Sequence, residues 1–252
     1  MENFWSLNRF FDPAETSGLY SAISRRESCR CFSAAPGITQ WEVLSTSAAA
    51  LALPGVRILL GDCENDLFQP FFGLLMKFEN VRRFAAIVLQ DDRPESVVNA
   101  GISGEMFLLS AVSLGLASCW VSGTYKRGKV TLPLQKGERV CALIALGVPK
   151  TPAALPLRRK RKPLSETCSP NFSDAPQIFV DAAKAIQEAP SAVNLQPCRL
   201  QYIPNDTLVV SVKRPAQRLD LGIGICHAVL AMENTPVQYS LSQDGCTARL
   251  TL

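Results

Sequence analysis

The sequence predicts an α+β fold in two related lobes, each built from an antiparallel-type sheet packed by helices. Short apolar runs typical of strands alternate with longer helical segments along most of the chain. The segments 99–111 and 219–232 resemble each other when Gly101 is aligned on Gly222, which indicates an internal repeat; chance similarity of two apolar helices is the alternative. A basic, Pro-rich stretch separates the two copies. The predicted division is a first lobe at 1–150, a linker arm at 151–176 and a shortened second lobe at 177–252.

The composition is that of a globular protein with a sizeable core. The chain has 252 residues, of which 47% are hydrophobic and 19% charged, and its formal net charge is +4. This charge is too small to indicate nucleic-acid binding by itself. No apolar run reaches the roughly 18–20 residues that span a bilayer, and the N-terminal MENFWSLNRFF has no signal-peptide core. We therefore expect a cytoplasmic protein with neither nucleic-acid nor membrane partners.

The nine cysteines predict neither a metal site nor a disulfide framework. Their number is odd, they are scattered, and no Cys-x-x-Cys pair occurs. Cys29-x-Cys31 has no second ligand pair, and the chain has one histidine, so we expect no bound metal. Cysteines inside apolar runs behave as small buried hydrophobes, and free thiols are typical of a reducing cytoplasm.

Apolar periodicity predicts the elements of the first lobe. The strongest helix signal spans 97–116, where apolar residues occur nearly all round the helix, so this helix should be central and buried. A helix at 38–53 should stop at Pro54-Gly55. Residues 67–80 carry apolar clusters at mixed spacing and are expected to form a helix or a lid. The other predicted elements are a helix at 15–27, strands at 56–61, 84–90 and 139–147, and an extended segment at 117–123.

The second lobe is predicted to hold a similar set of elements. A helix at 177–188 leads into the loop EAPSAVNLQP (188–197), whose short polar side chains can aim hydrogen bonds outward. A hairpin is expected around Pro204-Asn205-Asp206. The remaining elements are a helix at 219–232 and strands at 237–242 and 248–252.

Five segments resemble motifs of the FMN-dependent nitroreductase family. Arg26-Glu27-Ser28-Cys29-Arg30 resembles its Arg-x-Ser-x-Arg signature, and EAPSAVNLQPCRLQ resembles its Ala-Pro-Ser-x-x-Asn-x-Gln-Pro loop. GISGEMFLLSAVSLGLASCWVSG is similar to the central helix and flavin-facing strand, CALIALGVPK to the next strand, and RRKRKPLSE to the basic segment near the end of the family's core. The resemblance touches both halves of the chain and implies FMN as the cofactor.

The order of these motifs differs from that of ordinary family members. In those, the Ala-Pro-Ser loop follows Arg-x-Ser-x-Arg by a few tens of residues; here it comes about 160 residues later, and the matching slot AALALPGVRILLG has no Ser, Asn or Gln. The family forms two-fold dimers with each flavin across the interface, and fusing two subunits frees each half to keep its part of one site. The sequence resembles the fused, two-lobed branch: a monomer that acts as a pseudo-dimer, with one FMN per chain.

The resemblance implies that basic residues bind the FMN phosphate. An arginine fork matches a phosphate bidentately and stays charged. Arg30 would reach toward the N1–C2=O edge of the flavin, where a cation stabilises the reduced ring. Glu27 stands where many relatives carry a basic residue. The phosphate and ribityl contacts implied are Arg26, Ser28, Arg159 and Arg161, with a solvated helix end and a plain charged linker as the alternative interpretations.

The resemblance also implies which segments contact the rest of the flavin. The backbone after the central helix would run along the ring, with an N–H of Ser122 or Gly123 pointing at N5. The late loop would close over the pyrimidine edge or the ribityl hydroxyls. The alternatives are core packing for the tryptophan and an ordinary polar turn for the loop. The implied contacts are Trp120, Val121, Ser122 and Gly123 from the first segment and Pro190, Ser191, Asn194 and Gln196 from the loop.

No side chain is expected to be a catalytic residue, because the flavin N5 would carry the chemistry. His227, the only histidine, lies in an apolar helix and is interpreted as a satisfied core or interface residue. Gly222-x-Gly224 lacks the context of a Rossmann site, so NAD(P)H would visit transiently rather than be stored.

The implied activity is a ping-pong oxidoreduction. NAD(P)H would give a hydride to N5, and a small acceptor such as a nitroaromatic or a quinone would receive it. The alternatives are a flavin-binding or flavin-storing module, and a decayed pseudo-enzyme without strong turnover. Acceptor specificity is expected to lie in residues 62–83 and 124–138.

Overall fold

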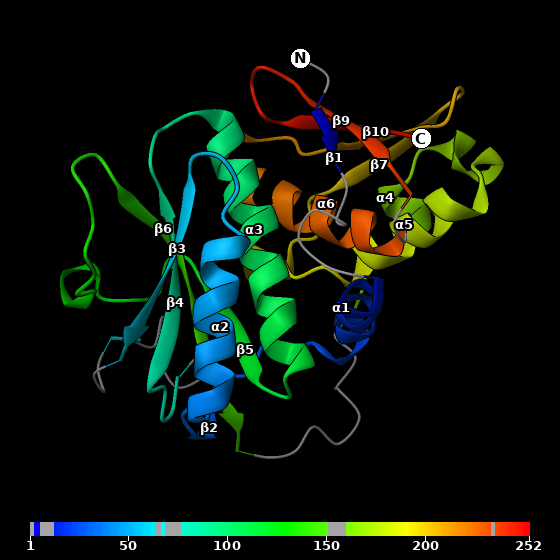
Figure 1. Cartoon of the computed structure of the whole chain (residues 1–252). Coiled ribbons are helices and arrows are strands. Elements are labelled where there is room, and N and C mark those ends of the chain that lie inside the picture. Colours follow the sequence, from blue (N-terminus) through cyan, green and yellow to red (C-terminus); the bar gives the residue numbers. More distant parts are fainter. Residues whose placement is uncertain (1–2, 6–12, 64–66, 69–76, 151–159, 233–234) are drawn as a thin grey trace.

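The computed structural model describes residues 3–5, 13–63, 67–68, 77–150, 160–232 and 235–252. Within these ranges the chain forms two antiparallel sheets with helices packed between and around them (Figure 1). The first sheet has the order β2 (Phe32–Ala34), β6 (Arg139–Pro149), β4 (Arg83–Leu89), β3 (Val56–Asp62), and β5 (Ala117–Val121) also pairs with β6. The second has the order β1 (Asn3–Trp5), β9 (Val237–Leu241), β10 (Thr247–Thr251), β8 (Thr207–Ser211), β7 (Arg199–Ile203).

The helices follow the predicted order along the chain. The longer ones are α1 (Pro13–Arg25), α2 (Ile38–Ala50), α3 (Pro94–Ser113), α5 (Gln177–Glu188) and α6 (Arg218–Ala231). Short helical turns are α4 (Leu164–Thr167), η3 (Arg127–Lys129), η4 (Pro170–Asp174), η5 (Ala192–Asn194) and η6 (Pro215–Gln217).

The two lobes share one strand topology, which confirms the predicted α+β class with antiparallel sheets. In the first lobe β3 pairs with β4, β4 with β6, and β6 with β5. In the second lobe β7 pairs with β8, β8 with β10, and β10 with β9. The helices α3 and α6 occupy the same place in the two sequences of elements. The repeat suggested by the sequence is therefore a repeat of topology.

The helices α3 and α6 cross at the two glycines that the sequence aligned. A Cβ atom built on Gly101 would lie 2.2 Å from the carbonyl oxygen of Leu219, and one on Gly222 would lie 2.0 Å from that of Val98. These contacts are reciprocal, since the 121-residue offset that carries Gly101 onto Gly222 also carries Val98 onto Leu219. Reciprocal contact is the signature of a two-fold axis, so a pseudo-two-fold axis passes through this crossing.

A hydrophobic core runs through this crossing and joins the lobes. One buried cluster contains residues of both sheets and of all five longer helices, and a smaller cluster lies on the other face of the first sheet. Figure 1 shows α3 between the first sheet and α6. By length and composition α3 could span a membrane, which corrects the expectation that no segment could, but 83% of its most apolar window is buried inside the protein.

The structure differs from the sequence prediction in a few elements. The helices α1 and α2 end at Arg25 and Ala50, a few residues earlier than expected. The segment predicted as a linker arm contains α4 and η4, and Cys168 forms a β-bridge to Leu200. The strands β1 and β2 were not predicted, and β1 joins the second sheet although it lies at the start of the chain. The predicted helix or lid at 67–80 falls largely outside the described residues.

Candidate functional site

The Arg-x-Ser-x-Arg segment follows α1 directly and runs beside β5. The backbone N–H of Arg26 still donates to Ala22, which makes it the last turn of the helix. Ser28 then forms a parallel bridge to Ser118, and the N–H of Cys29 donates to the Ser118 carbonyl over 2.9 Å. The fold thereby places this basic segment along the free edge of β5.

Arg26 is buried, with 7% of its surface exposed. Its Nε has no hydrogen-bond partner among the described residues, and the same holds for the hydroxyl of Ser118 on the neighbouring strand. Buried polar groups nearly always form hydrogen bonds, so these two unpaired groups on neighbouring segments indicate a missing hydrogen-bond partner. An anion with several acceptor oxygens suits a guanidinium and a hydroxyl.

Arg30 and Glu27 lie further out. The guanidinium carbon of Arg30 is 5.9 Å from the centroid of the Phe78 ring, within the range of a cation–π contact. Both residues are partly exposed. The structure therefore leaves the Arg30 charge accessible, as the predicted contact with the flavin edge requires.

The end of β5 is open on its backbone. Ser122 and Gly123 follow the strand and are exposed, and a Cβ atom built on Gly123 would meet nothing within 4 Å. Val121 points into the smaller cluster, whereas the Trp120 indole points the other way, against α3. The backbone of this segment and the Ser122 side chain are thus accessible to a ligand, whereas the partly buried Trp120 side chain packs against the core.

The late loop and the basic arm are brought together. The Arg161 guanidinium donates to Asn194 Oδ1 over 3.1 Å and to the carbonyl of Glu188 over 2.7 Å. The Lys162 N–H donates to Gln196 Oε1 over 2.8 Å, and Asn194 Nδ2 donates to the Lys160 carbonyl over 3.2 Å. Two predicted motifs that lie about 30 residues apart are therefore in contact. Arg159 lies outside the described residues.

The loop is held in a strained backbone conformation. Val193, Asn194 and Gln196 have φ values of 45°, 56° and 49°. This left-handed region is costly for a β-branched residue such as Val193, whose surface is 82% exposed. The Ser191 hydroxyl accepts the N–H of Gln196 over 2.9 Å, and Asp220 Oδ1 accepts the N–H of Ala192 over 3.1 Å. Strain held in place by such contacts is typical of binding loops.

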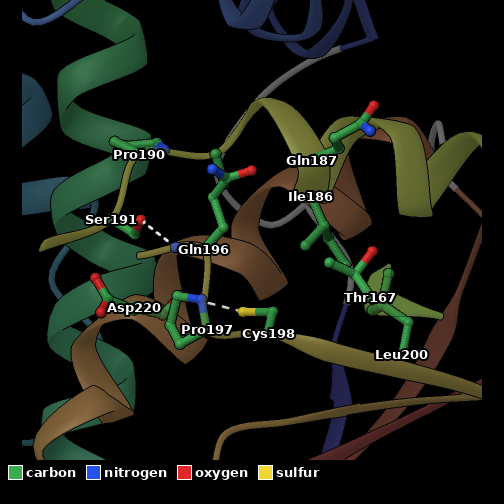
Figure 2. A pocket seen from close by; sticks show the side chains of 11 residues that line it. Thr167, Ile186, Gln187, Pro190, Ser191, Gln196, Pro197, Cys198, Leu200 and Asp220 are labelled. Carbon is green, nitrogen blue, oxygen red and sulfur yellow. Dashed lines mark hydrogen bonds between the residues drawn. The ribbon is translucent and has the colours of Figure 1, made fainter. Parts of the chain in front are cut away.

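A small pocket lies beneath this loop (Figure 2). Figure 2 shows the Ser191 hydroxyl turned toward the Gln196 backbone, with the Asp220 carboxylate on the same side. Burial raises the pKa of Asp220 to about 6, although the Ala192 N–H acts in the opposite direction. The lining residues are Thr167, Ile186, Gln187, Ala189, Pro190, Ser191, Gln196, Pro197, Cys198, Leu200 and Asp220.

Sequence reasoning missed Glu105, which is fully buried in α3. Its Oε2 accepts the Trp120 indole N–H over 2.7 Å, and its Oε1 lies 2.9 Å from His227 Nε2. His227 Nδ1 lies 2.9 Å from the Ala185 carbonyl oxygen, so the prediction of a satisfied core or interface histidine is confirmed. The available signal was one carboxylate in an apolar helix and one histidine in its repeat.

Comparisons with known proteins agree on one family. A family model described as "Putative TM nitroreductase" matches residues 18–232. A structure from Thermotoga maritima described as a "putative nitroreductase" has 22% identity and a TM-score of 0.62, and covers 93% of each chain. No curated protein matches the chain.

Two further solved structures match part of the chain. The NADPH:FMN oxidoreductase of Vibrio harveyi, complexed with NAD+, has 21% identity and a TM-score of 0.45 over 58% of this chain and 74% of that one. An FMN-dependent nitroreductase of Clostridium difficile has 16% identity and a TM-score of 0.43 over 62% and 96%.

Proposed function

The chain belongs to the TM nitroreductase family, and from this premise we propose that it is an FMN-dependent oxidoreductase with one flavin site between its lobes. It would pass reducing equivalents from NAD(P)H to a small acceptor such as a nitroaromatic or a quinone. Bound FMN would supply the hydride chemistry at its N5. The residues of the protein would bind the flavin, orient it and shield it from solvent.

The buried Nε of Arg26, which has no hydrogen-bond partner among the described residues, carries this proposal. An arginine that is 7% exposed with an orphaned Nε is costly unless a ligand completes its hydrogen bonds. A phosphomonoester offers a charge of about −1.5 to −2 and several acceptor oxygens. The Ser28 and Ser118 hydroxyls lie on the paired segments beside it and would add donors. The residues therefore fit the phosphate end of FMN.

The remaining contacts follow from the accessible groups. Arg30 would face the N1–C2=O edge, and an open backbone N–H of Ser122 or Gly123 would face N5. The late loop of the second lobe would cover the opposite side of the flavin, through Pro190, Ser191, Asn194 and Gln196. Arg161 already holds Asn194 and would join Arg159 at the phosphate. Trp120 and Val121 would pack on opposite faces of β5 and so hold the backbone of this site in place.

The difference between the lobes supports one flavin per chain. The second lobe has no second Arg-x-Ser-x-Arg segment. Along the free edge of β9, where such a segment would run by analogy with Ser28 beside β5, the chain places β1 instead. Among the described residues, the second lobe therefore offers no second phosphate-binding segment of the same kind.

Flavin titration with a matched pair of arginine variants tests the proposal. Arg26→Ala should weaken FMN binding about tenfold or more, because a charge-assisted contact to the phosphate is lost. Arg25→Ala removes the exposed neighbouring arginine and should leave the affinity nearly unchanged. Riboflavin, which lacks the phosphate, should bind both variants and the wild type alike. No FMN binding by the wild-type protein would refute the proposed function.

Anaerobic mixing separates an oxidoreductase from a storage module. Loss of the flavin absorbance on adding NADH or NADPH, followed by its return on adding a quinone or nitroaromatic, is the expected result. Bound FMN that neither nicotinamide reduces would identify the chain as a flavin-binding module.

A further inference from the structure

We propose that Glu105 and His227 are positioning residues that share one buried proton, held on His227, and that join the strand beside the flavin site to the second lobe. The predicted effect on flavin binding rests on the proposed function, whereas the shared proton does not.

The pair belongs to a chain of hydrogen bonds that crosses the pseudo-two-fold interface. It starts at the Trp120 indole on β5, passes through Glu105 on α3 to His227 on α6, and ends at the Ala185 carbonyl on α5. Glu105 and His227 are 122 residues apart in sequence, and both side chains are 0% exposed. The chain thereby ties the flavin-facing strand of one lobe to the helix that leads into the loop of the other.

The hydrogen-bond partners fix the number of protons in the pair. A carbonyl oxygen can only accept, so His227 Nδ1 must carry a proton toward Ala185. The indole N–H can only donate, so Glu105 Oε2 must accept it. One contact remains, between Oε1 and Nε2, and it needs one proton to be a hydrogen bond. The pair is satisfied by one shared proton and by no other count.

The surrounding charges favour the proton on the histidine. Burial alone would raise the pKa of Glu105, but the hydrogen bond and charge of His227, then the charge of Arg26, outweigh it and lower that pKa. The nearby Cys226 thiol has a pKa well above its usual value, first through burial and then through the Glu105 charge, so it stays neutral. The charges of an anionic Glu105 and a cationic His227 cancel, so the net charge of the three groups is that of Arg26, the proposed phosphate contact.

Gly104 leaves room for the Trp120 indole next to the Glu105 carboxylate. A Cβ atom built on Gly104 would lie 2.2 Å from Cη2 of Trp120, so only glycine admits the ring in this position. Glu105 then receives the ring N–H. Trp120 is followed by Val121 and Ser122, so the packing of its indole against Gly104 fixes the position of the backbone that would face the flavin.

The single histidine allows a direct test on the protein without flavin. In protein labelled with ¹⁵N-histidine, both ring nitrogens of wild-type His227 should carry protons at neutral pH. Glu105→Gln keeps every hydrogen bond, since the amide oxygen can accept from Trp120 and the amide NH₂ can donate to Nε2, but it removes the charge. Only Nδ1 should then be protonated. An unprotonated Nε2 in the wild type would overturn the assignment of the shared proton to His227.

Flavin affinity tests the positioning role. Glu105→Gln should bind FMN nearly as the wild type does, because the indole keeps its acceptor. Glu105→Ala should bind about tenfold more weakly, because a buried indole N–H loses its partner. Gly104→Ala should also weaken binding while leaving the histidine spectrum unchanged. Ser110→Ala, which removes only a hydroxyl bonded to its own helix, is the control.

Each outcome is decisive for one of the two proposals. If Glu105→Ala and Gly104→Ala both bind FMN as the wild type does, the positioning role is wrong. If Glu105→Ala does not fold, the comparison of Gly104→Ala with Glu105→Gln decides the role. If the wild-type protein binds no FMN, the proposed function fails and the positioning role fails with it. The histidine spectrum still decides where the proton shared by Glu105 and His227 is held.

Discussion

Asp220 and Asn99 are equivalent residues of the two lobes, related by the 121-residue offset that superposes the glycines of the helix crossing. Each contacts the loop that precedes a sheet. Asn99 Nδ2 donates to the Pro54 carbonyl over 3.0 Å, and Asp220 accepts the Ala192 N–H over 3.1 Å. The first lobe uses a neutral amide for this contact, whereas the second uses a carboxyl. The carboxyl makes the second loop sensitive to pH.

Asp220→Asn should stabilise the protein more at pH 7.5 than at pH 4.5. The pKa of Asp220 is about 6 in the folded chain, above its usual 3.8, so folding binds a proton in this window and stability falls as pH rises through it. Asparagine keeps an acceptor for Ala192 without the charge. A shift of this size corresponds to a gain of about 3 kcal/mol at most.

Urea unfolding of the two proteins at both pH values measures this effect. Asp92→Asn removes an exposed carboxylate of the first lobe and is the control. A stability difference that does not change between the two pH values would show that Asp220 is not the titrating group.

Val193 is the second residue-scale feature with a measurable cost. Its φ of 45° places a β-branched side chain in the left-handed region, and its side chain is largely exposed. Val193→Gly should therefore be more stable than Val193→Ala by about 1 kcal/mol, because glycine adopts this conformation without a Cβ clash. Urea unfolding compares the two variants; equal stabilities would mean that the loop relaxes without strain.

At the scale of elements, the crossing of α3 and α6 is the feature most sensitive to a single methyl group. Gly101→Ala and Gly222→Ala each place a Cβ atom about 2 Å from a backbone carbonyl oxygen, which cannot move without separating the helices. Each should lower the free energy of unfolding by about 3 kcal/mol.

Gly18→Ala provides the matched comparison within the same fold. Gly18 lies in α1, and a Cβ atom built there meets nothing within 4 Å. Alanine should raise stability by about 0.5–1 kcal/mol through its better helix propensity. Thermal unfolding of the three variants is the measurement, and a Gly101→Ala protein as stable as Gly18→Ala would contradict the close crossing.

Most elements could be predicted because their signals are local. The helix α5 and the hairpin of β7 and β8 lie where apolar period and turn residues placed them. The strands β1 and β2 have three residues each, too few for a period to show, and their partners lie far along the chain. The strand β1 pairs with β9 more than 230 residues later, which no local pattern encodes.

At the scale of the whole molecule, we predict one FMN per chain and one unfolding transition. The core is continuous across the α3–α6 crossing, so neither lobe can open without exposing the other's buried face. The described residues hold one proposed phosphate-binding segment and one strained loop, which together would form one site. Flavin absorbance per mole of protein, combined with sedimentation to establish a monomer, measures the ratio. Two flavins per monomer would contradict the asymmetric site.

The sequence by itself determined the α+β class, the order of most elements, the repeat centred on Gly101 and Gly222, and the motifs proposed for flavin. These are written in composition, period and spacing, which act over a few residues. Only the tertiary structure decided that the two glycines touch, that Glu105 is the partner of His227, and that the buried Nε of Arg26 has no hydrogen-bond partner in the part of the chain that the structure describes. Those facts depend on which distant surfaces meet when the two halves close over one core. That choice minimises exposed apolar area and unpaired polar groups for the chain as a whole.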